Sequence, residues 1–147
     1  MKEWSKALEI NAPIELVWLF FDGPLENTQQ IMPQVVVRKP VKITKKVVGS
    51  VYREKYKEGK RIEEYDVETV EYLNKPEYKN LKISFTLADM FEITARYEMK
   101  KLNENKTYFK YTTTNHPLRW FARFPLMFAS DKVVVEFVER VKHVAEA

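Results

Sequence analysis

The chain has 147 residues, of which 45% are hydrophobic and 31% charged, and its formal net charge is +4. This length is typical of one domain, and the apolar fraction is large enough for a packed core, so we expect residues 1–147 to form a single domain. The absence of cysteine excludes disulfides, thiolate catalysis and cysteine-bound zinc or iron–sulfur clusters. Two histidines and three glycines argue against a histidine-rich metal site or a glycine-rich phosphate loop. The sequence therefore predicts no metal and no cofactor.

Targeting and membrane-spanning segments are not expected. Glu9, Pro13 and Glu15 interrupt the first apolar stretch, which is unlike the layout of a secretion signal. The longest apolar runs, residues 16–21 and 124–129, are far shorter than the roughly 20 residues that a transmembrane helix needs. We therefore expect a cytoplasmic protein without stable membrane insertion.

The first third of the chain is expected to form one strand and two short helices. Residues 4–10 place Trp4, Leu8 and Ile10 on one face, as a half-buried strand does. A helix should follow, with Asn11 or Ala12 at its cap and Asp22-Gly23-Pro24 at its end. A second short helix is expected over residues 26–32.

Between residues 35 and 114 the apolar period becomes that of strands. Residues 91–99 alternate strictly between apolar and polar side chains, and residues 82–87 and 107–113 repeat this alternation. Residues typical of turns separate these segments at 58–60, 74–76, 88–90 and 103–105. Sequential strands with short turns indicate an antiparallel meander that has one wet face and one covered face.

The helical period returns after Pro117 and lasts to the C-terminus. Val134 and Val138 belong to one apolar stripe of this region. We expect one long helix over residues 117–146, about 40 Å in length and interrupted near Pro125. Such a helix is suited to cover the apolar face of a curved sheet.

Residues 10–24 and 30–33 resemble segments of the START-like, or SRPBCC, superfamily, to which the Bet v 1-like proteins belong. In residues 10–24 the matching features are Ala12-Pro13, Glu15, Val17-Trp18 and Asp22. Gln30-Ile31-Met32-Pro33 is a partial match to the Trp-Met-Pro-like segment of many members. The expected order of one strand, two helices, six strands and one helix is also that of the superfamily.

This resemblance implies an α+β helix-grip fold. In that fold a curved antiparallel sheet of about seven strands and a long C-terminal helix enclose an elongated hydrophobic cavity. The implied function is binding of a hydrophobic small molecule, such as a lipid, a polyketide or an aromatic metabolite. Two alternatives stay open, because a fold alone does not decide function: an enzyme resembling the polyketide cyclases or dehydratases, and a protein-interaction module.

The candidate ligand-binding residues are large side chains on the inward face of the expected strands and near the start of the expected C-terminal helix. They are Tyr65, Phe85, Leu87, Phe91, Ile93, Tyr97, Met99, Phe109, Tyr111, Phe121, Phe124 and Phe128. In most folds such residues simply form a packed core, but the concave sheet of the implied fold leaves room for a ligand. The tyrosine hydroxyls need partners when buried, and an oxygen atom of a ligand could supply one.

Residues 120–128 combine large apolar side chains with the helix breaker Pro125. Three interpretations of this segment stay open: a well-packed helix start, a movable mouth of the cavity, or a surface for transient membrane contact. The oligomeric state is not predicted.

Positive charge concentrates between Arg38 and Arg61, where ten cations face two carboxylates. Five carboxylates follow in residues 63–71, on the next expected strand, where they can pair with these cations. No motif for nucleic-acid recognition accompanies the cations. We therefore expect a charge-balanced sheet face and no nucleic-acid partner.

Support for catalysis is thin. His116 lies beside Asn115 at the expected strand-to-helix junction, near the expected rim of the cavity. A general base needs an orienting partner, and no carboxylate can be assigned to that role for His116. Asp89 is assigned to a turn. The sequence thus predicts no catalytic residue.

Overall fold

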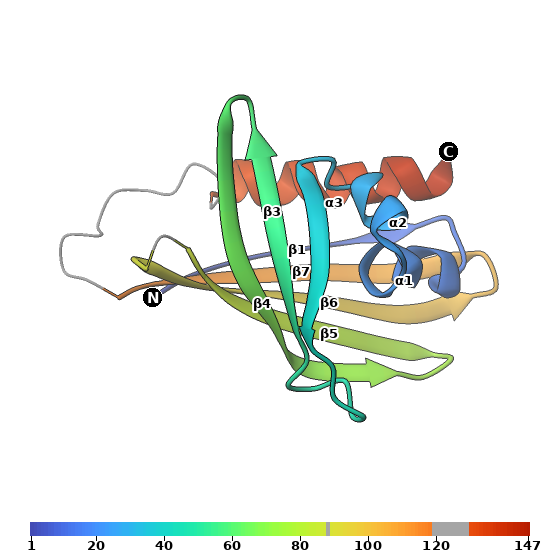
Figure 1. Ribbon diagram of the computed structural model, residues 1–147. Coiled ribbons are helices and arrows are strands. Elements are labelled where there is room, and N and C mark those ends of the chain that lie inside the picture. The colour runs from blue at the N-terminus through green and yellow to red at the C-terminus, as the bar shows by residue number, and fades with distance from the viewer. Residues whose placement is uncertain (88, 119–129) are drawn as a thin grey trace.

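A strongly curved antiparallel sheet grips the C-terminal helix in the computed structural model, which describes residues 1–87, 89–118 and 130–147 (Figure 1). The strands are β1 (Lys2–Ile10), β2 (Val35–Lys42), β3 (Val51–Glu58), β4 (Arg61–Asn74), β5 (Tyr78–Leu87), β6 (Phe91–Asn103) and β7 (Lys106–Pro117). The helices are α1 (Ile14–Asp22), α2 (Leu25–Gln29) and α3 (Asp131–Glu146). The seven strands are hydrogen-bonded in the order β1-β7-β6-β5-β4-β3-β2, so the expected meander is confirmed.

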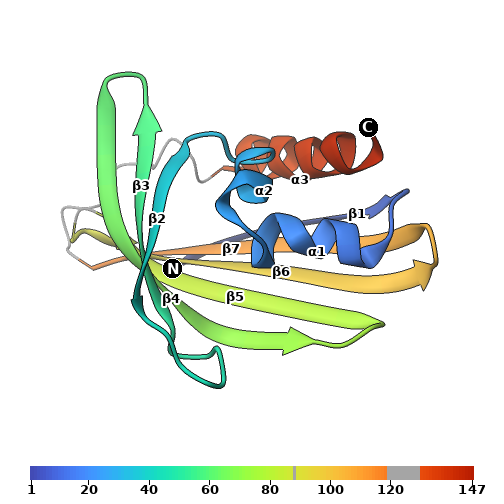
Figure 2. The ribbon, with the colours of Figure 1, turned by 45° about the vertical axis from the view of Figure 1, so that its right-hand side comes forward.

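The curvature of the sheet originates in β4. The first part of β4, residues 61–68, pairs with β3, whereas residues 68–74 pair with β5. A register shift between Thr69 and Glu71 marks a bulge, and bulges bend the strand that carries them. The half of the sheet formed by β2, β3 and β4 therefore turns away from the half formed by β5, β6, β7 and β1, and the face between them is concave (Figures 1 and 2).

Helix α3 lies across this concave face. Its buried residues include Val134, Val138 and Val141, which follow the apolar stripe read from the sequence. The side chain of Ser130 accepts a hydrogen bond from the backbone N–H of Val133 and caps the helix. Among the described segments, no helix is long and apolar enough to span a membrane.

The expectation of one helix over residues 117–146 is wrong. Strand β7 continues to Pro117, because Asn115, His116 and Pro117 pair with residues 91–93 of β6. The helix begins only at Asp131, after the Ser130 cap, and its 16 residues span about 24 Å.

Helices α1 and α2 close one end of the concave face (Figure 2). The cap position of α1 is Pro13 rather than Asn11 or Ala12, and the carbonyl oxygen of Pro13 accepts the first helical hydrogen bond at 3.1 Å. Gly23 ends α1, as expected. A Cβ atom at Gly23 would lie 2.4 Å from the carbonyl oxygen of Leu19, so a larger residue would displace this turn.

Candidate ligand-binding cavity

A cavity of about 840 Å³ lies between the concave face of the sheet and the helices. Its described lining comes from strands β2 to β7 and from all three helices. Pockets that bind drug-sized molecules usually measure about 300–1,000 Å³. The cavity is therefore large enough for such a ligand, and its two walls differ in chemistry.

One wall, formed by β5 and β6, is apolar. Its side chains are Leu81, Ile83, Phe85, Leu87, Ile93 and Ala95. They are alternate residues of their strands, so they share one face of the sheet. The strand register places Phe85 opposite Ile93 and Ile83 opposite Ala95, which makes this wall continuous.

Aromatic rings extend this wall toward α3. Tyr97 of β6 and Tyr111 of β7 are directly opposite in the register, and their ring centroids lie 5.5 Å apart. Phe21 of α1 stacks on Tyr97 at 4.2 Å, and Phe137 of α3 contacts Tyr111 at 4.8 Å. Helix and sheet therefore meet here through rings, of which Tyr97 and Tyr111 carry hydroxyls.

The opposite wall, formed by β2, β3 and β4, contains an ion pair. Arg38, Glu54 and Tyr65 lie side by side on these three strands. The Nε atom of Arg38 donates to Glu54 Oε2 at 2.8 Å, and Nη1 of Arg38 donates to Thr28 Oγ1 at 3.2 Å. Glu54 is only 8% exposed, and burial of an unpaired carboxylate is unfavourable, so Arg38 is what makes this position tenable.

Two tyrosines of the cavity, Tyr65 and Tyr97, have raised pKa values and keep their hydroxyl protons. Burial is the largest cause of the strongly raised pKa of Tyr97, and the neighbouring Tyr111 and Glu54 raise it further. Burial also raises the pKa of Tyr65, with the Glu54 carboxylate as the second cause. Neither hydroxyl has a hydrogen-bond partner among the residues that the structure describes. Both are therefore available to donate a hydrogen bond to an oxygen atom inside the cavity.

The structure brings six of the predicted residues together around the cavity. They are Tyr65, Phe85, Leu87, Ile93, Tyr97 and Tyr111. Phe91, Met99 and Phe109 are buried but belong to the packed core instead of the described lining. Phe109 is covered by Phe21, with ring centroids 5.6 Å apart, because α1 lies over that end of the sheet. Phe121, Phe124 and Phe128 lie outside the described residues.

Sequence reasoning missed the ion pair of the cavity. The charged stretch over residues 38–61 predicts a charge-balanced sheet surface for Arg38 and Glu54, whereas the structure places both side chains in the cavity lining. The alternation within β3 was the available signal: Tyr52, Glu54 and Tyr56 line the cavity, whereas Arg53 and Lys55 point to the other face.

His116 does not lie at a strand-to-helix junction, contrary to expectation. It is exposed within β7, opposite Glu92 of β6. The described cavity lining ends on β7 with Thr113, Thr114 and Asn115 and does not include His116. In residues 1–87, 89–118 and 130–147, no group of three His, Cys, Asp or Glu side chains could hold a metal ion.

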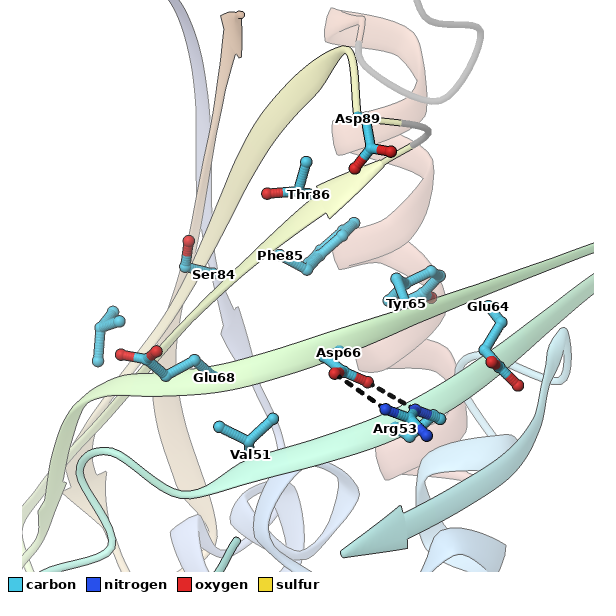
Figure 3. Close-up of a pocket in the computed structure, with 11 residues that line it drawn as sticks. Val51, Arg53, Glu64, Tyr65, Asp66, Glu68, Ser84, Phe85, Thr86 and Asp89 are labelled. Atoms are coloured by element: carbon cyan, nitrogen blue, oxygen red, sulfur yellow. Dashed lines mark hydrogen bonds and ion pairs between the residues drawn. The ribbon is translucent and has the colours of Figure 1, made fainter. Parts of the chain in front are cut away.

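A second, more polar hollow of about 640 Å³ shares Tyr65 and Phe85 with the cavity (Figure 3). The two rings stack there with centroids 4.7 Å apart. Arg53 donates two hydrogen bonds to Asp66, at 2.9 and 3.3 Å. Both side chains are about half exposed, so this pair adds little stability.

The expected pairing of charges between β3 and β4 is observed for two of the five carboxylates, Asp66 and Glu64. Besides Arg53 and Asp66, Lys55 lies 3.9 Å from Glu64. Glu71 instead forms its ion pairs with Lys82 and Arg96 on β5 and β6. This part of the sheet surface is thus charge-balanced.

Comparison with known proteins identifies the fold. No protein-family profile and no curated protein sequence matches the chain. The structure of major latex-like protein 151 from Panax ginseng matches with a TM-score of 0.68 and 14% identity, over 99% of this chain and 95% of that chain. Truncated norcoclaurine synthase from Thalictrum flavum matches with a TM-score of 0.67 and 14% identity, over 97% and 92%.

A third similar structure is the di-domain ARO/CYC protein BexL from the BE-7585A biosynthetic pathway. It has a TM-score of 0.71 and 14% identity, over 99% of this chain and 47% of that chain. These likenesses, at low identity, concern architecture. The chain therefore has the Bet v 1-like, helix-grip fold of SRPBCC proteins, as the N-terminal segments implied.

Proposed function

We propose that this protein binds a hydrophobic small molecule, such as a lipid, a polyketide or an aromatic metabolite. The observation that carries the proposal is the cavity of about 840 Å³ between the curved sheet and α3. Burial of ligand surface against the β5–β6 wall would contribute about 25 cal/mol per Å² of apolar area. The ring-lined region around Tyr97 and Tyr111 suits a flat ligand, because aromatic rings favour offset-stacked neighbours.

The polar groups of the wall formed by β2, β3 and β4 favour a ligand that also carries an oxygen-containing group. Tyr65 and Tyr97 can each donate a hydrogen bond to such a group. In the described hydrogen-bond network Glu54 uses Oε2 for Arg38, which leaves Oε1 to accept from a hydroxyl of the ligand. An amphipathic ligand would thus place its apolar body on β5 and β6 and its polar group near β3 and β4.

The similar structures are consistent with small aromatic ligands. One structure of Thalictrum flavum norcoclaurine synthase is a complex with dopamine and hydroxybenzaldehyde. Aromatic molecules that bear a hydroxyl are therefore sensible first probes for this cavity.

A fluorescence titration tests the proposal. The uncharged dye N-phenyl-1-naphthylamine should bind the wild-type protein with an increase in its emission. Ala95 is 4% exposed and lines the cavity, so the ring of Ala95→Phe should occupy part of the ligand space beside the β5–β6 wall and weaken binding several-fold. Val36→Phe is the matched control, because Val36 is 40% exposed and does not belong to the described lining. Absence of dye binding to the wild-type protein would contradict the proposal, and equal binding by folded Ala95→Phe protein would show that the dye does not occupy the space beside Ala95.

A cyclase-like or dehydratase-like activity is the second candidate. The supporting observation is the buried Glu54 carboxylate near the hydroxyls of Tyr65 and Tyr97, since such groups can accept and donate protons. This alternative predicts that Glu54→Gln abolishes turnover of a polyketide substrate and leaves its binding within a few-fold of wild type. Turnover unaffected by this substitution would remove Glu54 from any catalytic role.

A further inference from the structure

The loop between β2 and β3 carries an unbalanced positive charge. Residues 39–53 contain no carboxylate, and the loop and its flanks hold Lys39, Lys42, Lys45 and Lys46. All four lysines are exposed. None of these lysines takes part in the ion pairs of the described residues. Arg53, which follows the loop on β3, is by contrast paired with Asp66. The loop therefore offers its charge to a partner outside the molecule.

Exposed aliphatic side chains alternate with these lysines. Val41, Ile43 and Val48 are 52%, 61% and 43% exposed. A single exposed aliphatic residue needs no explanation. Three of them within eight residues, surrounded by lysines, have the composition of segments that lie in the interface of an anionic membrane.

The loop has a fixed shape. The backbone N–H of Thr44 donates to Ser50 Oγ at 3.0 Å, and Thr44 Oγ1 donates to the carbonyl oxygen of Val48 at 2.7 Å. Gly49 N–H donates to the carbonyl oxygen of Thr69 at 2.8 Å, which ties the loop to β4. Val47 has a φ of 69°, and a branched residue in this left-handed region is held there by its surroundings. Little conformational entropy would be lost when such a loop docks.

The position of the loop suits contact with an extended surface. It projects from the sheet on the side away from α3, as both ribbon views show (Figures 1 and 2). Val47, in the same loop, also belongs to the cavity lining. A surface that touches the loop is therefore adjacent to one edge of the cavity.

We propose that residues 39–48 dock the protein onto an anionic lipid surface. The lysines supply attraction to lipid headgroups, and Ile43 with Val41 and Val48 supplies contact with the acyl region. A nucleic acid would use the same lysines but would gain little from exposed valine and isoleucine side chains. The docking does not depend on the ligand proposed for the cavity.

Vesicle flotation tests the docking. Vesicles of phosphatidylcholine with about 30% phosphatidylglycerol should bind the wild-type protein, and pure phosphatidylcholine vesicles should not. Each lysine near an anionic surface strengthens binding about five-fold, so Lys45→Glu with Lys46→Glu should weaken it at least about 25-fold. Ile43→Ser should weaken it several-fold without any change of charge. Binding should also fall when salt is raised from about 50 mM to about 300 mM.

The matched control is Lys57→Glu with Lys60→Glu, which makes the same change of net charge near the β3–β4 turn. This variant should keep its binding within about three-fold of wild type. Equal losses in the two double variants would contradict the proposal, because net charge alone would then govern binding. Absence of binding to the anionic vesicles at low salt would contradict it as well. An unaffected Ile43→Ser variant, together with tighter binding to single-stranded RNA than to vesicles, would assign the loop to nucleic acid instead.

Discussion

The two walls of the cavity are stabilised in different ways. The β5–β6 wall consists of aliphatic and aromatic side chains, for which removal from water is favourable by itself. The β2–β4 wall contains the buried carboxylate of Glu54. Its burial is tenable only because Nε of Arg38 donates a hydrogen bond to Glu54 Oε2 at 2.8 Å. The first wall can thus tolerate conservative changes of shape, whereas the second depends on both partners of one pair.

The largest expected effect is a difference in the free energy of unfolding between a substitution in the packed core and one in the cavity wall. Phe109 is 0% exposed and covered by Phe21, so Phe109→Ala should lower the free energy of unfolding by about 3–5 kcal/mol. Phe85 faces the cavity and has fewer neighbours to lose, so Phe85→Ala should lower it by roughly 1–2 kcal/mol. Urea unfolding measures both values. Equal losses would mean that Phe85 is packed as tightly as Phe109.

The next largest effect is the difference in stability lost when the buried ion pair or a half-exposed ion pair is broken. Glu54→Ala leaves Arg38 without its partner inside the cavity and should lower the free energy of unfolding by roughly 2–3 kcal/mol. Asp66→Ala breaks the half-exposed pair with Arg53 on the other face of the same strands and should change it by less than about 1 kcal/mol. A loss for Asp66→Ala as large as that for Glu54→Ala would refute the distinction between the walls.

A smaller effect concerns the hydroxyl of Tyr97. Tyr97→Phe retains the ring stacked on Phe21 and Tyr111, so the stability should stay within about 1 kcal/mol of wild type. Affinity for 2-naphthol should fall about three- to ten-fold, and affinity for naphthalene should not change, since only the former can accept the lost hydrogen bond. Calorimetric titration of both probes provides the comparison. Parallel changes for the two probes would exclude a hydrogen bond from Tyr97.

The smallest effect concerns Tyr72, which lies outside the cavity. Burial, followed by the hydrogen bond to Asp22 at 2.6 Å, raises the pKa of Tyr72 to about 12. The raised pKa means that the protonated Tyr72 hydroxyl stabilises the folded protein. This contribution is complete below the unfolded-state pKa of about 10 and is lost as the pH rises through 12. Unfolding followed from pH 9 to 12 should show a shallower alkaline loss for Tyr72→Phe than for wild type. Identical pH profiles would contradict this assignment.

Much of the fold could be predicted because strict alternation leaves few alternatives. In residues 91–99 only a strand with one covered face explains the pattern, and the structure has this strand as part of β6. Turn residues such as Gly59, with a φ of 61°, fixed where strands end. The start of α3 was missed because residues 117–129 have a helix-like apolar spacing, whereas pairing with β6 extends β7 to Pro117.

The candidate site was harder to predict because its polar contacts join residues that are distant in the sequence. Lys79, which does not belong to the described cavity lining, shows the same difficulty in the core: it is 1% exposed and lies opposite Met99, on the covered side of the sheet. Its Nζ atom reaches Glu15 of α1 at 2.9 Å and also contacts Asn74. Arg38 and Glu54 are a second example. Neither pairing follows from local patterns, because each requires the register or the docking of another element.

Native mass spectrometry tests the central claim, that the cavity holds a hydrophobic ligand, most directly. The wild-type protein is measured as purified and after incubation with excess 2-naphthol, and any adduct is extracted into organic solvent. One small lipophilic molecule per chain is expected, with lower occupancy in the Ala95→Phe variant. A bare protein mass in both samples would contradict it.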